Sequence, residues 1–314
     1  MTFLTIVIDL NPNIAKIGPL LITWHGVFSV LGIIAAARLG FWLVEKDGVE
    51  LPGGGGDGLA WMVVVGLVGA RLLYVWENFR LFSGNLLRMF ALTEGGISQW
   101  GGLFGAALGA YIWARLAKFS FWKLVDAGGP AAMIGLTVGR IGDVINGEHH
   151  GTPTNLPWGV RYVNPATLGE PDKVVHPEVA YEMVLCLAIL AAVLPFHQRL
   201  KKRMPEGALG LTYFAVYATG RFFLSYLRTD PSVFIGLRQA QLASAVMVII
   251  AIIAVPLLFR RAAATAAPAP ATPARVESTH EPVHATPEQP SARRPRGARK
   301  RRRKPAASES KRSS

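Results

Sequence analysis

The sequence has few charged side chains, a single cysteine and no cleavable signal pattern. Asp, Glu, Lys and Arg make up 17% of its 314 residues, whereas a soluble domain ordinarily has about 25%. One cysteine, Cys186, excludes an intramolecular disulfide framework. Polar residues and a proline at positions 9–13 interrupt the first apolar stretch, so we expect no cleaved leader. The composition argues against both an ordinary soluble domain and a small disulfide-stabilised secreted domain.

Long apolar runs take the place of the missing charges. Hydrophobic residues make up 51% of the chain, and they gather in blocks of about 20 residues, long enough to cross the ~30 Å hydrocarbon core as helices. We therefore predict an all-α, polytopic membrane protein with about seven transmembrane helices within residues 1–261. The expected spans are Pro19–Val44, Gly58–Trp76, Ile97–Ala117, Phe121–Ile141, Pro177–Phe196, Leu209–Leu227 and Gln239–Phe259.

Small residues recur at every fourth position in three of these spans. This spacing lets helix backbones approach closely in lipid. We interpret the small residues as packing seams without a chemical role. They are Gly32, Ala36 and Gly40; Gly101, Gly105 and Gly109; and Gly135 and Gly139.

The net charge of +13 is concentrated in the last part of the chain. Residues 262–314 contain 12 Lys or Arg and 4 Asp or Glu, which gives +8. This Ala/Pro-rich, polybasic segment cannot bury a core, so we predict a disordered tail. Beside a membrane, such a tail is expected to contact anionic lipid headgroups. Charge alone would also permit nucleic-acid binding, but we expect no nucleic-acid partner.

The basic residues of the short loops predict the orientation in the membrane. Their distribution favours a cytoplasmic C-terminus, because Lys and Arg are enriched in cytoplasmic loops. With seven spans, the N-terminus then lies outside. The longest loop, residues 146–176, is predicted to face outward as well.

Three arginines, Arg71, Arg140 and Arg221, lie within or at the end of predicted spans. Charged groups there are costly and tend to mark function. The planar guanidinium matches phosphate oxygens, so several arginines around an apolar cavity would suit a phospholipid headgroup. An ion pair with Asp143 is the structural alternative for Arg140. Arginines that extend their side chains to water are the alternative elsewhere, and that explanation suits Arg38 and Arg228.

The sixth span carries a polar stripe. Tyr217, Arg221, Ser225 and Arg228 are spaced by four, four and three residues, so they share one helical face. In the fifth span, Glu178 and Glu182 lie one turn apart. The first of them is explained by the positive end of the helix dipole.

Six segments, taken in order, resemble the bacterial prolipoprotein diacylglyceryl transferase family. Each is a weak match alone, but together they cover residues 17–242. They are Ile17-Gly18-Pro19 with Trp24-His25-Gly26, Gly69-Ala70-Arg71-Leu72-Leu73-Tyr74, Gly95-Gly96-Ile97-Ser98-Gln99-Trp100-Gly101-Gly102, Gly139-Arg140-Ile141-Gly142 with Asn146-Gly147-Glu148, His176-Pro177-Glu178 with Tyr181-Glu182, and Gly220-Arg221-Phe222 with Arg228 and Asp230-Pro231.

The resemblance implies a reaction. The diacylglyceryl group of phosphatidylglycerol would pass to the lipobox cysteine of a preprolipoprotein, forming a thioether and releasing glycerol phosphate. It implies no metal and no organic cofactor, and it implies the bacterial plasma membrane. We also expect a monomer. The expected lipid-binding residues are Arg71, Gln99, Arg140, Asn146, Glu148, Tyr217 and Arg221, with Arg140 and Arg221 as catalytic phosphate ligands.

Four positions depart from the family pattern. Gln99 stands at a histidine position, His25 at a tyrosine, Asp143 at an asparagine, and Ser225 where some members have glutamate. Glutamine cannot be a general base near neutral pH, so His25 is a candidate substitute, with a hydrogen-bonded packing histidine as the alternative.

The other candidates for chemistry have simpler explanations. Asp143 could be a base or simply the partner of Arg140, and we favour the partner. The loop histidines His149 and His150 are expected to be solvated. Two other functions stay open at this point: a catalytically inactive lipid-binding relative, and a small-solute permease with an arginine-lined cavity. No internal repeat supports the permease.

Overall fold

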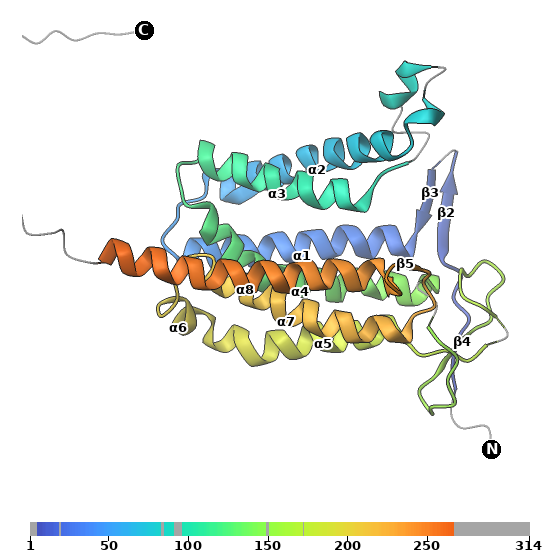
Figure 1. Ribbon diagram of the computed structural model, residues 1–314. Coiled ribbons are helices and arrows are strands. Elements are labelled where there is room, and N and C mark those ends of the chain that lie inside the picture. The colour runs from blue at the N-terminus through green and yellow to red at the C-terminus, as the bar shows by residue number, and fades with distance from the viewer. Residues whose placement is uncertain are drawn as a thin grey trace, which may run out of the picture. The chain divides into compact units, whose positions relative to one another are not determined.

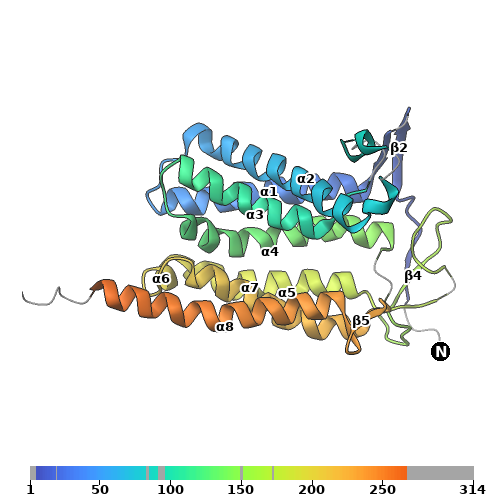
Figure 2. The same cartoon turned by 45° about the horizontal axis from the view of Figure 1, so that its top comes forward.

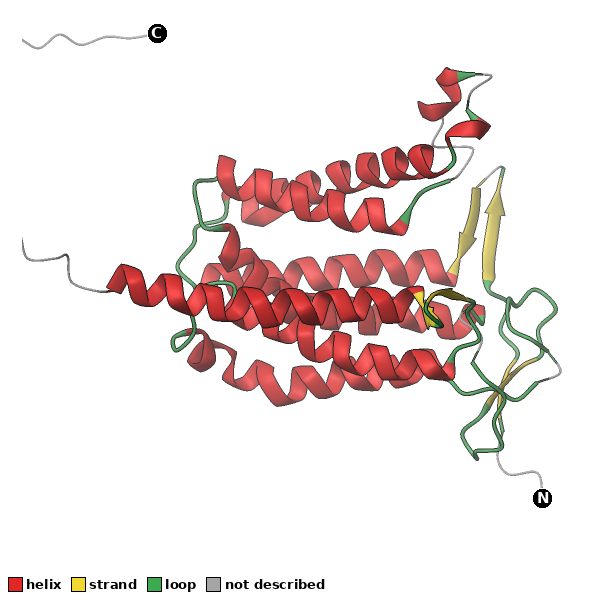
Figure 3. Cartoon of the chain, in the orientation of Figure 1, coloured by secondary structure: helices red, strands yellow, loops and turns green. Residues whose placement is uncertain are grey.

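The computed structural model describes residues 5–18, 20–82, 85–90, 96–148, 151–171 and 173–266. Of Leu20, Pro52, Leu86 and Gln99 only the backbone is described. The predicted disordered tail, from residue 267 onward, and the loop histidines His149 and His150 lie outside the described residues. The described part is mainly helical, with short strands gathered at one end (Figure 3).

Each of the seven predicted spans coincides with a helix. The helices are α1 (Trp24–Lys46), α2 (Gly56–Glu77), α3 (Gln99–Leu116), α4 (Phe121–Asn146), α5 (Glu178–Val193), α7 (Ala208–Leu224) and α8 (Gln239–Ala266). Short helical turns are η1 (Pro52–Gly55), η2 (Phe79–Leu81), η3 (Leu86–Phe90), η5 (Leu194–Phe196), α6 (His197–Lys201) and η6 (Ser225–Leu227). The all-α membrane architecture is therefore confirmed, and α8 continues past residue 261.

Four of the described helical segments are long and apolar enough to cross a membrane: Trp24–Lys46, Gly53–Glu77, Glu178–Lys201 and Gln239–Thr265. The other three predicted spans, α3, α4 and α7, are helices that run alongside these four in the same bundle (Figures 1 and 2). In α4, the charged side chains Lys123, Asp126, Arg140 and Asp143 lower the mean hydropathy. The chain is a multi-pass membrane protein.

The helices pack in pairs, with α1 along α4, α2 along α3, and α7 along α8 (Figures 1 and 2). Glycines permit the first two pairings. A β-carbon on Gly32 would lie 2.6 Å from the backbone oxygen of Gly135, and one on Gly109 would lie 2.5 Å from that of Trp61. These approaches are shorter than carbon–oxygen contact allows, so the small residues form the predicted packing seams, except for Gly139, where a β-carbon would meet nothing within 4 Å.

Short strands surround the end of the bundle where α1 and α5 begin (Figure 1). Strand β1 (Ile6–Ile8) pairs in parallel with β4 (Val160–Tyr162). Strands β2 (Asn13–Ile17) and β3 (Leu20–Thr23) form one antiparallel hairpin, and β5 (Ser232–Phe234) and β6 (Leu237–Arg238) form another. Because residues 20–23 form β3, the first helix begins at Trp24, where the Thr23 hydroxyl accepts a hydrogen bond from Gly26 N–H at 3.1 Å.

Polar contacts fix the opposite end of the bundle. The buried carboxylate of Asp126 accepts hydrogen bonds from the backbone N–H groups of Gly207 and Gly210, both at 2.9 Å. It thereby caps the N-terminus of α7. Lys201 forms an ion pair with Asp47 and lies 3.9 Å from Asp126. Between the two ends, α4, α5 and α7 share an apolar cluster that includes the fully buried Cys186.

Candidate active site

The segment 139–148 forms the last turns of α4 and the residues that follow them. A spacing of three residues keeps Arg140, Asp143 and Asn146 on one helical face. The helix ends at Gly147, whose φ of 75° lies in the left-handed region that favours glycine. Nη1 of Arg140 donates to Oδ2 of Asp143 at 2.6 Å. The ion pair considered from the sequence is therefore present.

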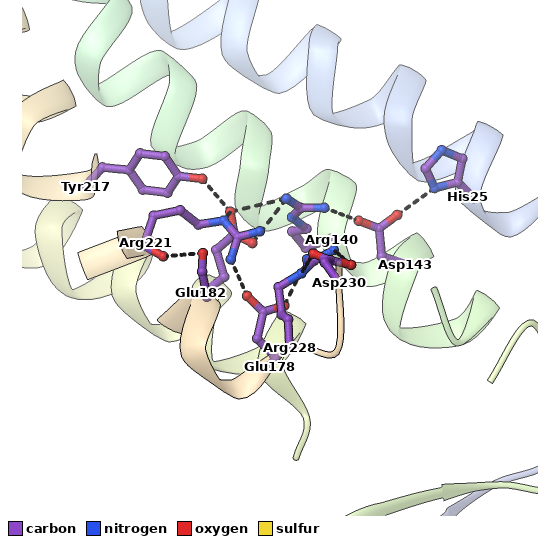
Figure 4. A network of polar contacts seen from close by, with 10 residues as sticks. His25, Arg140, Asp143, Glu178, Glu182, Tyr217, Arg221, Arg228 and Asp230 are labelled. Carbon is purple, nitrogen blue, oxygen red and sulfur yellow. Dashed lines mark hydrogen bonds and ion pairs between the residues drawn. The ribbon is translucent and has the colours of Figure 1, made fainter. Parts of the chain in front are cut away.

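Arg140 also contacts a carboxylate of α5, which connects it to α7. Its Nη2 lies 3.1 Å from Oε2 of Glu182, a side chain with no solvent exposure. Glu182 accepts a hydrogen bond from the Tyr217 hydroxyl and lies 3.5 Å from Nε of Arg221. Two of the three arginines that the sequence singled out, Arg140 and Arg221, are thus held by one buried carboxylate (Figure 4).

A second buried carboxylate, Glu178, lies between Arg221 and Arg228. It forms an ion pair with Arg221, and its Oε2 lies 3.2 Å from Nη1 of Arg228. Arg228 also donates to Asp230, with Nε 2.5 Å from Oδ2. Glu178 lies in the first turn of α5, as the helix dipole favours, but it is also 1% exposed between two guanidiniums. The expectation for Arg228 was wrong, because it is 5% exposed instead of extending to water.

His25 joins the network from the first turn of α1. Its Nδ1 lies 2.6 Å from Oδ1 of Asp143 and 3.7 Å from Oε2 of Glu148. The other oxygen of Glu148 accepts a hydrogen bond from Nδ2 of Asn146 at 2.5 Å. The approach of α1 to α4 depends on Gly142, since a β-carbon there would lie 2.6 Å from Cα of His25.

These side chains form a continuous series of charged contacts. It runs from His25 through Asp143, Arg140, Glu182, Arg221, Glu178 and Arg228 to Asp230, and it connects α1, α4, α5 and α7 (Figure 4). All of it lies at the end of the bundle that carries the loop 147–177.

Two features bear on what the site can hold. Among the described residues, the donor atoms of His25, Asp143 and Glu148 lie within 4.8 Å of one another, close enough to hold a cation. A cation bound there would, however, have to displace the hydrogen bond between Nδ1 of His25 and Oδ1 of Asp143, and it would lie beside a carboxylate that already holds the Arg140 guanidinium. The second feature is the hydroxyl of Tyr162, from β4, which is close enough to Asp143 to interact with it electrostatically. Burial, with a smaller effect of the Asp143 charge, raises its pKa to about 12, so it stays protonated and donates to the Val144 carbonyl at 2.9 Å.

Comparison with known proteins identifies the family. A family model described as prolipoprotein diacylglyceryl transferase matches residues 12–257, most of the chain. The chain belongs to this family. It is 32% identical over 241 residues to the phosphatidylglycerol–prolipoprotein diacylglyceryl transferase of Nostoc sp., a match that covers 74% of this chain and 84% of the relative. It is 33% identical to the protein of that name from Clostridioides difficile, covering 74% and 89% respectively.

Membership confirms the family and the diacylglyceryl transferase activity that the sequence motifs led us to expect. A third relative, from Gloeobacter violaceus, is 32% identical over 263 residues and covers 82% of this chain and 96% of the relative. The matched range contains every residue of the charged network from His25 to Asp230. The network therefore lies within the part of the chain that the family model matches.

One predicted lipid-binding residue of the transferase, Arg71, lies apart from this network. Arg71, 6% exposed in α2, donates to three backbone carbonyls: Nε to Met89 at 2.7 Å, Nη1 to Gly96 at 2.8 Å and Nη2 to Arg88 at 2.7 Å. These bonds hold the segment that follows α2, and a lipid contact of Arg71 stays a prediction. The side chain of Gln99 lies outside the described part of the chain.

The sequence did not assign Glu178, Glu182 and Arg228 to the site of the transferase. Their spacing carried a signal, because Glu178 and Glu182 lie one turn apart at the start of an otherwise apolar span. A charged pair on one face of a membrane helix requires a partner on another helix. The polar face of the sixth span, which presents Arg221 and Arg228, was the candidate for that partner, and the structure pairs both arginines with Glu178.

Proposed function

We propose that this transferase moves the diacylglyceryl group of phosphatidylglycerol to the thiol of the lipobox cysteine of prolipoproteins. The sulfur bonds to the glyceryl carbon of the lipid, the bond between that carbon and the phosphate oxygen breaks, and glycerol phosphate leaves. The names of the relatives support both substrates. In this chain, the proposal is carried by Arg140 and Arg221, which lie 3.1 and 3.5 Å from one buried carboxylate, Glu182.

The two guanidiniums suit a phosphodiester that becomes a better leaving group when its charge is stabilised. Attack by a thiolate leaves the departing phosphate with a second negative charge, and donors already in place stabilise such charge best. Glu178 and Glu182 fix the guanidiniums before any lipid binds. The side chains therefore lose little conformational freedom at the moment of reaction.

Polar groups beside the arginines suit the glycerol headgroup. Asn146 and Glu148 are joined by a 2.5 Å hydrogen bond just beyond the end of α4, and Glu148 keeps an oxygen that can accept from a hydroxyl. Tyr217 is fixed on Glu182 at the inner side of the arginines. We assign these three residues, with Gln99, to the lipid-binding site.

His25 is the proposed proton acceptor. A thiol attacks as its thiolate, so a base must receive its proton. An imidazole can do this near neutral pH and the amide of Gln99 cannot. The His25 side chain is 43% exposed, and through Asp143 it is one residue removed from Arg140.

The position of the site supports activity at the outer face of a bacterial plasma membrane. It lies at the bundle end that carries the predicted outward loop, so the N-terminus would be outside and the C-terminus cytoplasmic. The basic tail would then meet anionic headgroups of the inner leaflet. We propose that the protein acts there as a monomer.

Purified protein supplied with phosphatidylglycerol and a lipobox peptide tests the proposal. Mass spectrometry should detect the thioether product, and Arg221→Ala should lower its rate by about 10²-fold or more, as removal of a single transition-state donor does. Arg38→Ala, which removes an exposed arginine of α1, is the matched control and should keep the wild-type rate. An inactive wild type would refute the function, and an active Arg221→Ala would refute the phosphate site.

A further inference from the structure

We infer that Asp143 is a positioning residue that orients His25 as the general base, so that the two residues act as a His–Asp pair. This inference rests on the proposed function and adds a role to it. The sequence alone had favoured Asp143 only as the ion-pair partner of Arg140. The contact between Asp143 and His25 of α1 gives Asp143 a second role.

The geometry determines which nitrogen of His25 can accept a proton. Oδ1 of Asp143 lies 2.6 Å from Nδ1 of His25, and an ionised carboxylate can only accept hydrogen bonds. Nδ1 must therefore carry the hydrogen. In the neutral ring, Nε2 then holds the lone pair that can take the thiol proton.

The different burial of His25 and Asp143 determines which of the two side chains can meet the substrate. The Asp143 side chain is 4% exposed, whereas that of His25 is 43% exposed. A substrate thiol can therefore meet the imidazole and cannot reach the carboxylate. This arrangement is unlike a packing histidine, whose ring would itself be enclosed.

Asp143 also connects the base to the proposed phosphate site. Its Oδ2 holds Arg140 at 2.6 Å while its Oδ1 holds His25 at the same distance. The residue that receives the thiol proton and a residue that binds the leaving phosphate are thus fixed on one carboxylate. Gly142 permits this arrangement, because any β-carbon there would press on the backbone of His25.

The other charged and titratable groups near His25 come from the same end of the bundle. Glu148, beyond α4, lies 3.7 Å from Nδ1, and Arg140 is the next residue along the network. Tyr162, from β4, is close enough to Asp143 to interact electrostatically with it. Of these groups, Asp143 alone makes a short hydrogen bond to the ring.

The proton balance of the reaction is simple. The thiol proton moves to Nε2 of His25, the sulfur–carbon bond forms, and the carbon–oxygen bond to phosphate breaks. The phosphate leaves as a monoester with two negative charges. The imidazolium can then return its proton to that phosphate, whose second pKa is about 6, and this restores the neutral ring.

A double-mutant cycle on the purified enzyme tests the pair. Asp143→Asn and His25→Phe should each lower kcat by about 10²-fold or more, the range of general-base catalysis, with a smaller change of KM for phosphatidylglycerol. The double variant should lose much less rate than the product of the two single losses, because Asp143 would act mainly through His25 and only its hold on Arg140 would add a further loss. Arg71→Ala, at an arginine of α2 that lies apart from the network, is the control whose effect should multiply with that of His25→Phe.

The outcomes separate the two levels of the proposal. A wild type that makes no thioether would overturn the proposed function itself. An active wild type with multiplicative losses in the His25→Phe/Asp143→Asn cycle would overturn the pair alone, as would an Asp143→Asn variant that raises KM and keeps kcat.

A second measurement does not depend on activity or on the stability of the variants. Nitrogen NMR of the isotope-labelled wild-type protein, with the His25 signals identified by their loss in His25→Phe, should find the neutral ring protonated at Nδ1. A ring protonated at Nε2 would overturn the inference.

Discussion

Adding one methyl group at Gly142 should separate the base from its partner. A β-carbon built there lies 2.6 Å from Cα of His25 and 3.0 Å from the backbone oxygen of Trp24. Non-bonded carbon atoms settle at about 3.5–4.0 Å, so α1 and α4 must separate locally by about 1 Å. The hydrogen bond between His25 and Asp143, now 2.6 Å, would then be broken or badly aligned.

The expected consequence is a loss of rate with the fold retained. Displacement of a catalytic group by about 1 Å can cost on the order of 10²-fold, so Gly142→Ala should lower kcat by that order in the thioether assay. The overpacking itself costs about 1–3 kcal/mol, which should appear as a lower melting temperature in detergent.

Gly139 supplies the matched control, one turn earlier on the same helix. A β-carbon at Gly139 would meet nothing within 4 Å, and alanine is favoured over glycine inside a helix by about 1 kcal/mol. Gly139→Ala should therefore keep its rate and melt no earlier than the wild type. Gly142→Ala with full activity would refute the close approach as a requirement of the site.

Three further predictions concern the network, the packing and the departures from the family. Glu178→Gln removes a carboxylate buried between two guanidiniums, so the free energy of unfolding should fall by about 3–5 kcal/mol and the melting temperature should fall with it. An unchanged melting temperature would contradict the ion-pair geometry. Gly109→Ala, whose β-carbon would lie 2.5 Å from a backbone oxygen of α2, should lower the melting temperature by overpacking the seam between α2 and α3, and thermal melting that matches the wild type would argue against that seam. We expect the departures at His25, Asp143 and Gln99 to compensate one another. The family-like double variant His25→Tyr/Asp143→Asn should then be inactive, and adding Gln99→His should raise the rate of thioether formation at least about tenfold. An active double variant would show that the three departures do not compensate one another.

The sequence was sufficient for the helical framework because the membrane imposes a length on apolar runs. All seven expected spans are helices, and the small residues of α1 and α3, with Gly135 of α4, lie at the close helix contacts. Helix boundaries differ from the predicted ones where local hydrogen bonding overrides hydropathy. At residues 20–23, for example, pairing with β2 turns the start of an apolar run into a strand.

The partners of the arginines could not be obtained in the same way. Which carboxylate meets Arg221 depends on the rotation of α5 about its axis and on its place beside α7, and neither is encoded in the spacing of charges along one span. Glu178 illustrates the difficulty, because an acidic residue in a first turn is already explained by the helix dipole. Contact between His25 and Asp143, 118 residues apart, likewise required the packing of α1 on α4.

The charge balance of the network determines how it can recognise an anionic lipid. Three guanidiniums face four carboxylates: Arg140, Arg221 and Arg228 against Asp143, Glu178, Glu182 and Asp230. A lipid phosphate is therefore not attracted by excess positive charge. Recognition must instead come from directed N–H groups that the carboxylates hold in place. At the proposed phosphate site, Glu178 and Glu182 should therefore be needed beside the arginines, and exchanging an arginine for lysine, which keeps the charge and loses the planar fork, should not preserve the site.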